Sequence, residues 1–248
     1  LNFEEDLKKY PYQSAVGYMY GINRGLIALG LFENEADIAN SPRQEFGSYL
    51  PGDIKYKDVN GDGLVNSDDN VPLEYSSTPQ IQYGLATEFN WKNFNVSILF
   101  EGTARMKYFR GGNMYNPFAG KETGNVITDY ANPANRWISR EISGTVATEN
   151  PNAKYPRLSY GGSWNNCLNS TFWLQDGSYL RLKNVQISYM MKNEFLRKFG
   201  LQSAQISLIG ENLAVWSKED MLDPSQAQYN GTKYPIQRVY TVQLNLAF

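Results

Sequence analysis

The chain has 248 residues, which is enough for one large domain or two small ones. Its formal net charge of −2 provides no basic field for nucleic acid, and no apolar run approaches the roughly 18–20 residues of a membrane-spanning helix. The chain contains no histidine and one cysteine, Cys167. This composition excludes an internal disulfide, a Ser-His-Asp triad and a histidine-ligated zinc site.

Aromatic residues make up 14% of the sequence, including 18 Tyr and 12 Phe. Such a share favours β structure, an aromatic belt at a membrane interface or a carbohydrate-contacting surface over a helical bundle. Strands are therefore the first elements to look for in the chain.

A weak strand is expected over residues 15–25, and a clear hairpin follows over 80–101. Apolar side chains alternate with small or polar ones through both halves of this hairpin, and the tight turn "WKN" separates them. Each half is about ten residues long, the length of a tilted strand that crosses a bilayer. The residues on the apolar face are Ile81, Tyr83, Leu85, Phe89, Trp91, Phe94, Val96, Ile98 and Phe100.

Three more alternating stretches occupy residues 178–191, 203–213 and 236–248. In the first of these, Leu180 and Leu182 are out of step with Val185, Ile187 and Tyr189. Either a bulge resets the register or the first half stands above the membrane. "MKNEFLRKFG" predicts one short helical turn that closes on Gly200.

The last strand is amphipathic almost to the end of the sequence. Tyr240, Val242, Leu244 and Leu246 share one face, followed by the terminal Phe248. A closed barrel needs its last strand to pair with its first, so this pattern predicts a barrel strand at 236–248. The plain alternative is a core strand that happens to stand last.

The links between these strands are of two kinds. Short links are expected at 91–93 and 191–201, whereas long links without periodicity occupy 23–79, 103–177 and 213–236. Outer-membrane barrels have short turns on the periplasmic side and long loops outside. A soluble β-sandwich with hydrophobic-in, polar-out strands has the same period and remains the alternative.

The sequence "DVNGDGLVNSDD" at 58–69 has the spacing of a calcium-binding loop. Gly63 stands where such a loop turns sharply, and the last position holds an Asp in place of the usual bidentate Glu. Either a water or Asp68 is then needed to complete the shell, and a polar turn without metal is the alternative reading. The predicted calcium ligands are Asp58, Asn60, Asp62, Leu64 through its carbonyl, Asn66 and Asp69.

Two tryptophans in the long link 103–177 are weak candidates for substrate contact. Trp137 follows Asn135 and Arg136, and Trp164 precedes Asn165 and Asn166, a setting that suits stacking against a sugar. Loop tryptophans also serve to pin a loop to its own fold, and both readings stay open. No paired-carboxylate arrangement is evident, so no catalytic residue is assigned and the chain is not expected to be an enzyme.

Segments spread over nearly the whole chain resemble the C-terminal portion of the SusC/RagA family of TonB-dependent outer-membrane transporters. The resemblance is carried by "LPGDIKYKDVNGDGLVNSDD", "TPQIQYGLATEFNWKNFNVSILFEG", "FWLQDGSYLRLKNVQISY", "IGENLAVWSKEDMLDP" and "YPIQRVYTVQLNLAF". No one of these segments is specific alone, but their combination is.

The resemblance implies an all-β fold: about six C-terminal strands of an antiparallel transmembrane barrel of roughly 22 strands, with long extracellular loops. Residues 1–248 would then be the C-terminal part of the barrel, 53–70 a calcium-binding extracellular loop and 236–248 the terminal strand. The plug domain would lie outside this chain, which would be a fragment or one subunit of a split transporter.

The family also implies the location and partners of the protein. These are the outer membrane of a Gram-negative bacterium of the Bacteroidetes and its lipid, the rest of the barrel with its plug, and a SusD-like surface lipoprotein. TonB would be contacted through the absent N-terminal region, and the substrate would be an oligosaccharide or oligopeptide. The alternative function is a secreted, calcium-stabilised β-sandwich that binds glycans.

Overall fold

The computed structural model describes residues 5–118, 125–160, 162–192, 194–226 and 232–248. The chain divides into two compact units, each built from separated segments of the sequence. Unit 1 comprises 1–78, 107–175 and 227–233, and unit 2 comprises 79–106, 176–226 and 234–248. The short expected links and the alternating strands thus fall in unit 2, and most of the long links form unit 1.

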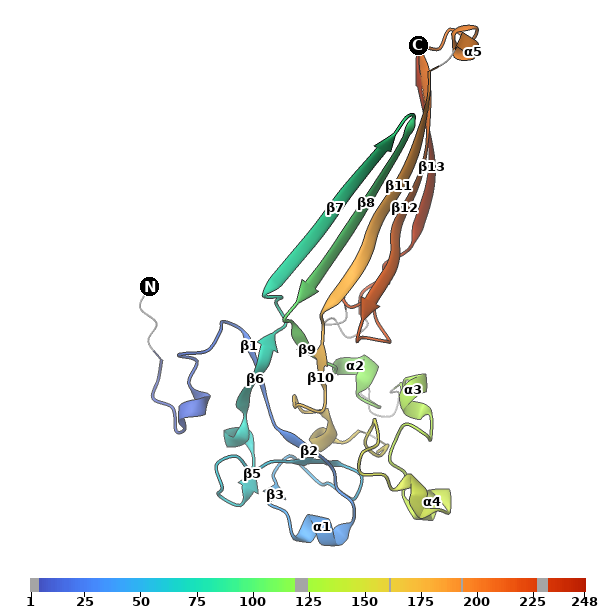
Figure 1. Ribbon diagram of the computed structural model, residues 1–248. Helices are drawn as coiled ribbons and strands as arrows, with labels where there is room; N and C mark the ends of the chain where they lie inside the picture. The colour runs from blue at the N-terminus through green and yellow to red at the C-terminus, as the bar shows by residue number, and fades with distance from the viewer. Residues whose placement is uncertain (1–4, 119–124, 161, 193, 227–231) are drawn as a thin grey trace. The chain divides into compact units, whose positions relative to one another are not determined.

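Unit 2 is a five-stranded sheet in which every neighbouring pair is antiparallel (Figure 1). The strand order across the sheet is β13-β12-β11-β8-β7. The strands are β7 (Ile81–Trp91), β8 (Phe94–Ala104), β11 (Tyr179–Met191), β12 (Ser203–Ser217) and β13 (Val239–Ala247).

The connections of this sheet follow the predicted asymmetry. A two-residue turn joins β7 to β8, with Lys92 in the left-handed region at φ 52°. The link from β11 to β12 contains the short helix α5 (Glu194–Arg197) and closes on Gly200. Because all pairs are antiparallel, both short links lie at one end of the sheet, and the long links depart from the other.

A β-bulge resolves the break in pattern inside β11. The register against both neighbouring strands shifts between Leu182 and Asn184. Lys183 is the additional residue against β8, whereas against β12 the additional residue belongs to β12, where Asn212 and Leu213 oppose Lys183. The shift returns Leu180 and Leu182 to the same face as Val185. The bulge reading of this stretch is confirmed.

With the bulge in place, one face of unit 2 is continuously apolar and the other is mostly polar. Leu85, Phe89, Val242 and Leu244 on the apolar face keep 59–69% of their surface exposed. A β-sandwich would bury such side chains under a second sheet. The pairing register places these residues on the apolar face: Ile81, Tyr83, Leu85, Phe89, Trp91, Phe94, Val96, Ile98, Phe100, Leu180, Leu182, Val185, Ile187, Tyr189, Ala204, Ile206, Leu208, Trp216, Tyr240, Val242, Leu244 and Leu246.

About six barrel strands were expected, and the large sheet contains five in the ranges that the structure describes. The weak strand expected at 15–25 is β1 (Ile22–Gly25), and it pairs with β6 (Val71–Ser76) outside the large sheet. Its last residue, Gly25, is crossed closely by another backbone, since a Cβ there would lie 2.4 Å from the carbonyl oxygen of Asn169.

Unit 1 is built from short elements that carry no readable period in the sequence (Figure 1). It contains four two-stranded sheets in the described ranges. The pairs β1–β6 and β2–β4 are antiparallel and β3–β5 is parallel. The fourth sheet pairs β9 with β10. The remaining elements are β2 (Ala28–Leu31), α1 (Glu35–Ala39), β3 (Arg43–Gln44), β4 (Ile54–Tyr56), β5 (Leu64–Val65), β9 (Lys107–Phe109), β10 (Leu174–Asp176), α2 (Gly112–Tyr115), α3 (Thr128–Ala131), α4 (Arg140–Ser143) and the 3₁₀ helices η1 (Pro11–Gln13), η2 (Ser67–Asp69), η4 (Val146–Thr148) and η5 (Trp164–Cys167).

An aromatic core holds these short elements together. Tyr130 stacks on Tyr155 with ring centroids 4.4 Å apart, and Trp137 packs directly against Gly52. A Cβ on Gly52 would lie 2.3 Å from the indole, and its φ of +86° also demands glycine. The buried core residues are Leu26, Leu31, Ile54, Tyr56, Val65, Tyr130, Trp137, Tyr155 and Trp173.

A buried polar network adds specific links across this core. The Gln44 amide donates to Asn165 Oδ1 at 2.6 Å, and the Tyr56 hydroxyl donates to the carbonyl of Asn165 at 2.7 Å. The Asn166 amide donates to Asp53 at 2.7 Å. Because these groups are buried and satisfied, they hold 44–56 against 165–166 without an unpaired polar group.

None of the helices in the described ranges is long and apolar enough to cross a membrane.

Candidate functional site

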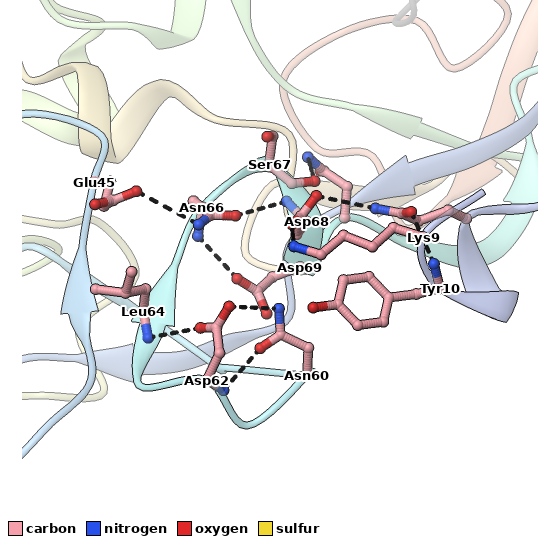
Figure 2. Close-up of polar contacts among 12 residues, drawn as sticks. Lys9, Tyr10, Glu45, Asn60, Asp62, Leu64, Asn66, Ser67, Asp68 and Asp69 are labelled. Carbon is pink, nitrogen blue, oxygen red and sulfur yellow. Dashed lines mark hydrogen bonds and ion pairs between the residues drawn. The ribbon is translucent and has the colours of Figure 1, made fainter. Parts of the chain in front are cut away.

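The acidic loop 58–69 begins after β4, contains β5 and ends with η2; several of its residues are shown in Figure 2. Both ends are anchored in unit 1, because Tyr56 precedes the loop and Val65 follows its turn, and both are buried. The parallel pairing of Gln44 with Val65 holds β5 against β3. The exposed turn at 61–63 is therefore presented between two fixed ends.

Asp58 organises the turn by accepting two backbone hydrogen bonds. One carboxylate oxygen accepts from the Gly61 N–H at 2.7 Å and the other from the Gly63 N–H at 2.8 Å. Both glycines have positive φ, 76° and 83°. Open space surrounds them, so it is this backbone conformation, not crowding, that favours glycine.

Asn60 and Asp62 lie within the same turn (Figure 2). The side-chain Oδ1 of Asn60 accepts from the Asp62 N–H at 2.9 Å, and the Asp62 carboxylate accepts from the Leu64 N–H at 2.9 Å. The Asn60 amide also donates to Asp62 at 3.0 Å. Each of these side-chain oxygens has two lone pairs and accepts fewer hydrogen bonds within the turn than those lone pairs allow.

Asp69 closes the loop from its far end. Its carboxylate is fully buried and accepts from the Val59 N–H at 2.7 Å and the Asn66 N–H at 2.8 Å. It therefore ties the first residues of the loop to the last, and Asn66 in turn caps η2 by accepting from the Asp68 N–H at 2.8 Å.

Asp68 is used differently, as the anchor of the N-terminal segment 5–16 (Figure 2). Its carboxylate lies 2.6 Å from Lys9 Nζ and accepts from the Gln13 amide at 3.3 Å. The hydrogen bond from Lys9 lowers the pKa of Asp68, and the same pair raises the pKa of Lys9. Of the two adjacent aspartates, Asp69 is the one whose carboxylate bonds to the backbone of the loop itself.

The loop contains hard oxygen donors, but its carboxylates are not concentrated at one point. Within the described ranges, no three His, Cys, Asp or Glu side chains come together as a metal-binding group. A cation here would depend equally on amide and carbonyl oxygens, such as those of Asn60, Asn66 and Leu64, which calcium accepts as ligands. Calcium binding at this loop stays a prediction.

The two candidate tryptophans occupy contrasting environments. Trp137 is 5% exposed and belongs to the core of unit 1, so its position is that of a residue that pins its own loop. Trp164 begins η5 and is 71% exposed, which leaves its ring free to contact a ligand. Substrate contact by either residue stays a prediction.

Sequence reasoning missed a cavity of about 450 Å³ in unit 1. It lies beside Trp137, and its walls come from four separate stretches: 33–35, 50–51, 136–142 with 149, and 157–158. No periodic or motif signal joins these stretches in the sequence. Only their folding around the aromatic core brings them together.

No protein-family model matches the chain. Two curated relatives from Formosa agariphila do. TonB-dependent receptor P26 is 29% identical over 247 residues and TonB-dependent receptor P3 is 24% identical over 249 residues, each alignment covering 94% of this chain. The chain spans only 23% and 22% of the length of these relatives.

Solved structures agree on the fold. The RagAB peptide transporter superposes with a TM-score of 0.61 at 19% identity, covering 92% of this chain and 23% of that one. The RagAB peptide importer in its open-open state gives a TM-score of 0.63 at 17% identity, covering 95% and 25%. The antiparallel sheet of unit 2 is accordingly a section of a β-barrel wall. The resemblance of this chain to the C-terminal portion of a SusC/RagA-type TonB-dependent receptor is confirmed by these relatives and structures.

Proposed function

We propose that this chain supplies part of the barrel wall and of the extracellular surface of an outer-membrane TonB-dependent nutrient importer. The observation that carries the proposal is the uncovered apolar face of unit 2, which continues across all five strands. In a lipid bilayer such a face is favourable, and the inner strands β8, β11 and β12 are each paired with a neighbour on both sides.

The distribution of aromatic rings on that face supports a membrane position. Trp91, Phe94 and Tyr189 lie near the end with the short links, and the Phe94 and Tyr189 ring centroids are 4.6 Å apart. Tyr83 and Trp216 lie toward the opposite end. Aromatic girdles at both interfaces flank the aliphatic band of known outer-membrane barrels.

The opposite face of the sheet suits a water-filled lumen. Ser188 and Ser207 share a hydrogen bond of 2.8 Å between neighbouring strands, and Asn95 donates to Glu88 at 2.5 Å. These polar contacts lie on the face of the sheet opposite the apolar one. On this proposal they line the path beside the plug.

The substrate class and the partners rest on the relatives. The RagAB structures are described as a peptide transporter and importer, and the family resemblance extends the proposed substrates to oligosaccharides. A SusD-like lipoprotein lid, a plug and TonB complete the proposed importer, in the outer membrane of a Bacteroidetes cell. Trp164 is the exposed residue proposed to contact substrate or lid.

We also propose that the acidic loop holds a structural calcium ion. Asp58, Asp62 and Asp69 place three carboxylates in twelve residues, while Asp68 is occupied by Lys9. A divalent ion would offset their mutual repulsion and fix the turn at Gly61 and Gly63. The role of the ion is to order the loop for docking and involves no chemical step.

Spin labelling of the full-length receptor tests the membrane proposal. Single cysteines at Ile98 and Leu244, in a Cys167→Ser background, should be relaxed by oxygen, which partitions into lipid. Cysteines at the neighbours Ser97 and Asn245 should respond to a water-soluble nickel chelate. Equal response to the nickel chelate at both parities would refute a lipid-facing apolar face.

A further inference from the structure

Arg181 is a buried cation on the polar face of the unit 2 sheet. It pairs with Glu101 on β8 and Val215 on β12, and it is 2% exposed. The nearby Lys183 and Glu101 side chains on the same strands keep 40% and 37% exposure. Contacts from outside the sheet contribute to this burial.

The covering groups come from residues 218–226, the segment that directly follows β12. Asp223 Oδ1 lies 2.5 Å from an Arg181 terminal nitrogen, and Ser225 Oγ accepts from the same nitrogen at 3.3 Å. Ser225 also donates to Asp223 through its N–H at 3.1 Å and its hydroxyl at 2.6 Å. The Tyr179 ring completes the site, 5.4 Å from the guanidinium carbon.

The segment has internal order of its own. The buried Glu219 carboxylate accepts from the Met221 N–H at 2.9 Å, and the Gln226 N–H donates to the Asp223 carbonyl at 2.9 Å. Pro224 is buried between them. These contacts make 218–226 a compact turn that is attached to the polar face at Arg181.

We propose that residues 218–226 form a ledge across the polar face of the barrel wall, that Arg181 is its positioning residue, and that the ledge narrows the passage along that face to solutes. The proposal rests on the proposed function, in which the polar face is the lumen. A buried guanidinium needs a carboxylate partner, so the attachment depends on charge as well as on packing.

Hydrogen exchange on the full-length receptor tests the attachment. Arg181→Met and Asp223→Asn should each speed exchange of the amides in 218–226 by on the order of tenfold, with β11 and β12 unchanged. Arg181→Lys should restore much of the protection, and the double variant should be no worse than either single one. Lys183→Met is the matched control, since Lys183 contacts Glu101 at 3.3 Å and not the ledge. Unchanged exchange in both single variants would overturn the proposal.

Thiol reactivity tests the narrowing. A cysteine at the exposed Glu211, on the polar face of β12, is treated from outside with a small methanethiosulfonate and a bulky polyethylene-glycol maleimide. The ratio of bulky to small reaction rates should rise several-fold in Arg181→Met and stay constant in Lys183→Met. If hydrogen exchange shows that Arg181→Met releases the ledge but the ratio of reaction rates stays constant, the attachment would stand and the narrowing would be refuted. Reaction at a cysteine replacing Leu208 but never at Glu211 would refute the lumenal assignment of this face, and with it the proposed function.

Discussion

Tyr83 reaches across strand β8 and donates a hydrogen bond from its hydroxyl to the backbone carbonyl of Tyr179, 2.8 Å away on β11. The ring crosses over Gly102, where a Cβ would lie 2.5 Å from the Tyr83 ring and 2.4 Å from the Tyr179 oxygen. One aromatic side chain thus links three strands at a position where glycine leaves room.

Replacing Gly102 should weaken this part of the sheet. Gly102→Ala should destabilise the folded receptor by about 1–3 kcal/mol, because the Tyr179 oxygen is backbone and moves only with its strand. Tyr83→Phe should cost about 1 kcal/mol through the lost hydrogen bond. Heat-modified electrophoretic mobility of the purified receptor measures both. Gly84→Ala is the control, since its Cβ would lie at an ordinary 3.5 Å from Phe100. An equal loss at Gly84 would contradict the explanation.

The lipid-facing assignment predicts a penalty that alternates along each strand. Arg at Ile98 or Leu244 should cost about 2–4 kcal/mol of barrel stability if these positions lie near the bilayer midplane. Arg at the adjacent Ser97 or Asn245 should cost much less, because these side chains face the polar side. Urea unfolding in lipid vesicles measures the difference, and similar penalties at both parities would show that the faces are wrongly assigned.

The ion pair between Asp53 and Arg157 should be important for unit 1. Asp53 is fully buried and lies 2.8 Å from Arg157 Nε. Asp53→Asn should lower the free energy of local opening of unit 1 by about 3 kcal/mol. This is the lower end of the cost of breaking a buried ion pair, because the Arg157 side chain keeps 20% exposure.

Hydrogen exchange at the Ile54 amide reports this opening, since that amide is bound to Asn166 at 2.9 Å. The exposed pair Arg140 and Glu149 provides the comparison. Arg140→Gln should change protection by less than about 1 kcal/mol. A similar loss of protection in the two variants would mean that the burial of Asp53 does not determine how much its ion pair stabilises unit 1.

The calcium proposal predicts a saturable site whose occupancy depends on Asp58 and Asp62. Terbium luminescence, excited through the nearby Tyr12, should reveal an ion that calcium displaces with an affinity of about 10⁻⁴–10⁻³ M. Asp58→Ala with Asp62→Ala should abolish the signal, loosen residues 53–70 and weaken lid association or import, while the barrel still inserts. Asp68→Asn should leave the signal intact, because the Asp68 carboxylate is paired with Lys9 of the N-terminal segment. Loss of the signal in Asp68→Asn, or no signal at all, would contradict the proposal.

The attachment of the N-terminal segment should depend on pH. The contact with Lys9 holds the pKa of Asp68 below its usual value of 3.8. A lowered folded-state pKa means that the contact stabilises the attachment fully above the ordinary value and is lost as pH falls through the lowered one. Proteolysis by pepsin within residues 5–16 should therefore accelerate in strong acid. Asp68→Asn should be cleaved faster at mild pH and show little further change.

The alternating patterns of unit 2 were sufficient to predict its strands, whereas the choice of a barrel over a β-sandwich came from the family resemblance. The hairpin 81–104, the turn that closes on Gly200 and the terminal strand are all present, because period-2 alternation over nine or more residues directly reports which side chains share a face. Even the bulge at Lys183 left a readable trace, the change of parity between Leu182 and Val185.

The tertiary structure alone decided how unit 1 is built and what covers Arg181. Strands of two to six residues carry too few side chains for a period, so the core around Trp137 and the network of Gln44, Asn165 and Asn166 had no signal in the sequence. The pairing of Arg181 with Asp223 joins residues 42 positions apart. Such contacts depend on how the chain returns to a strand face, and local residue patterns carry no information about that return.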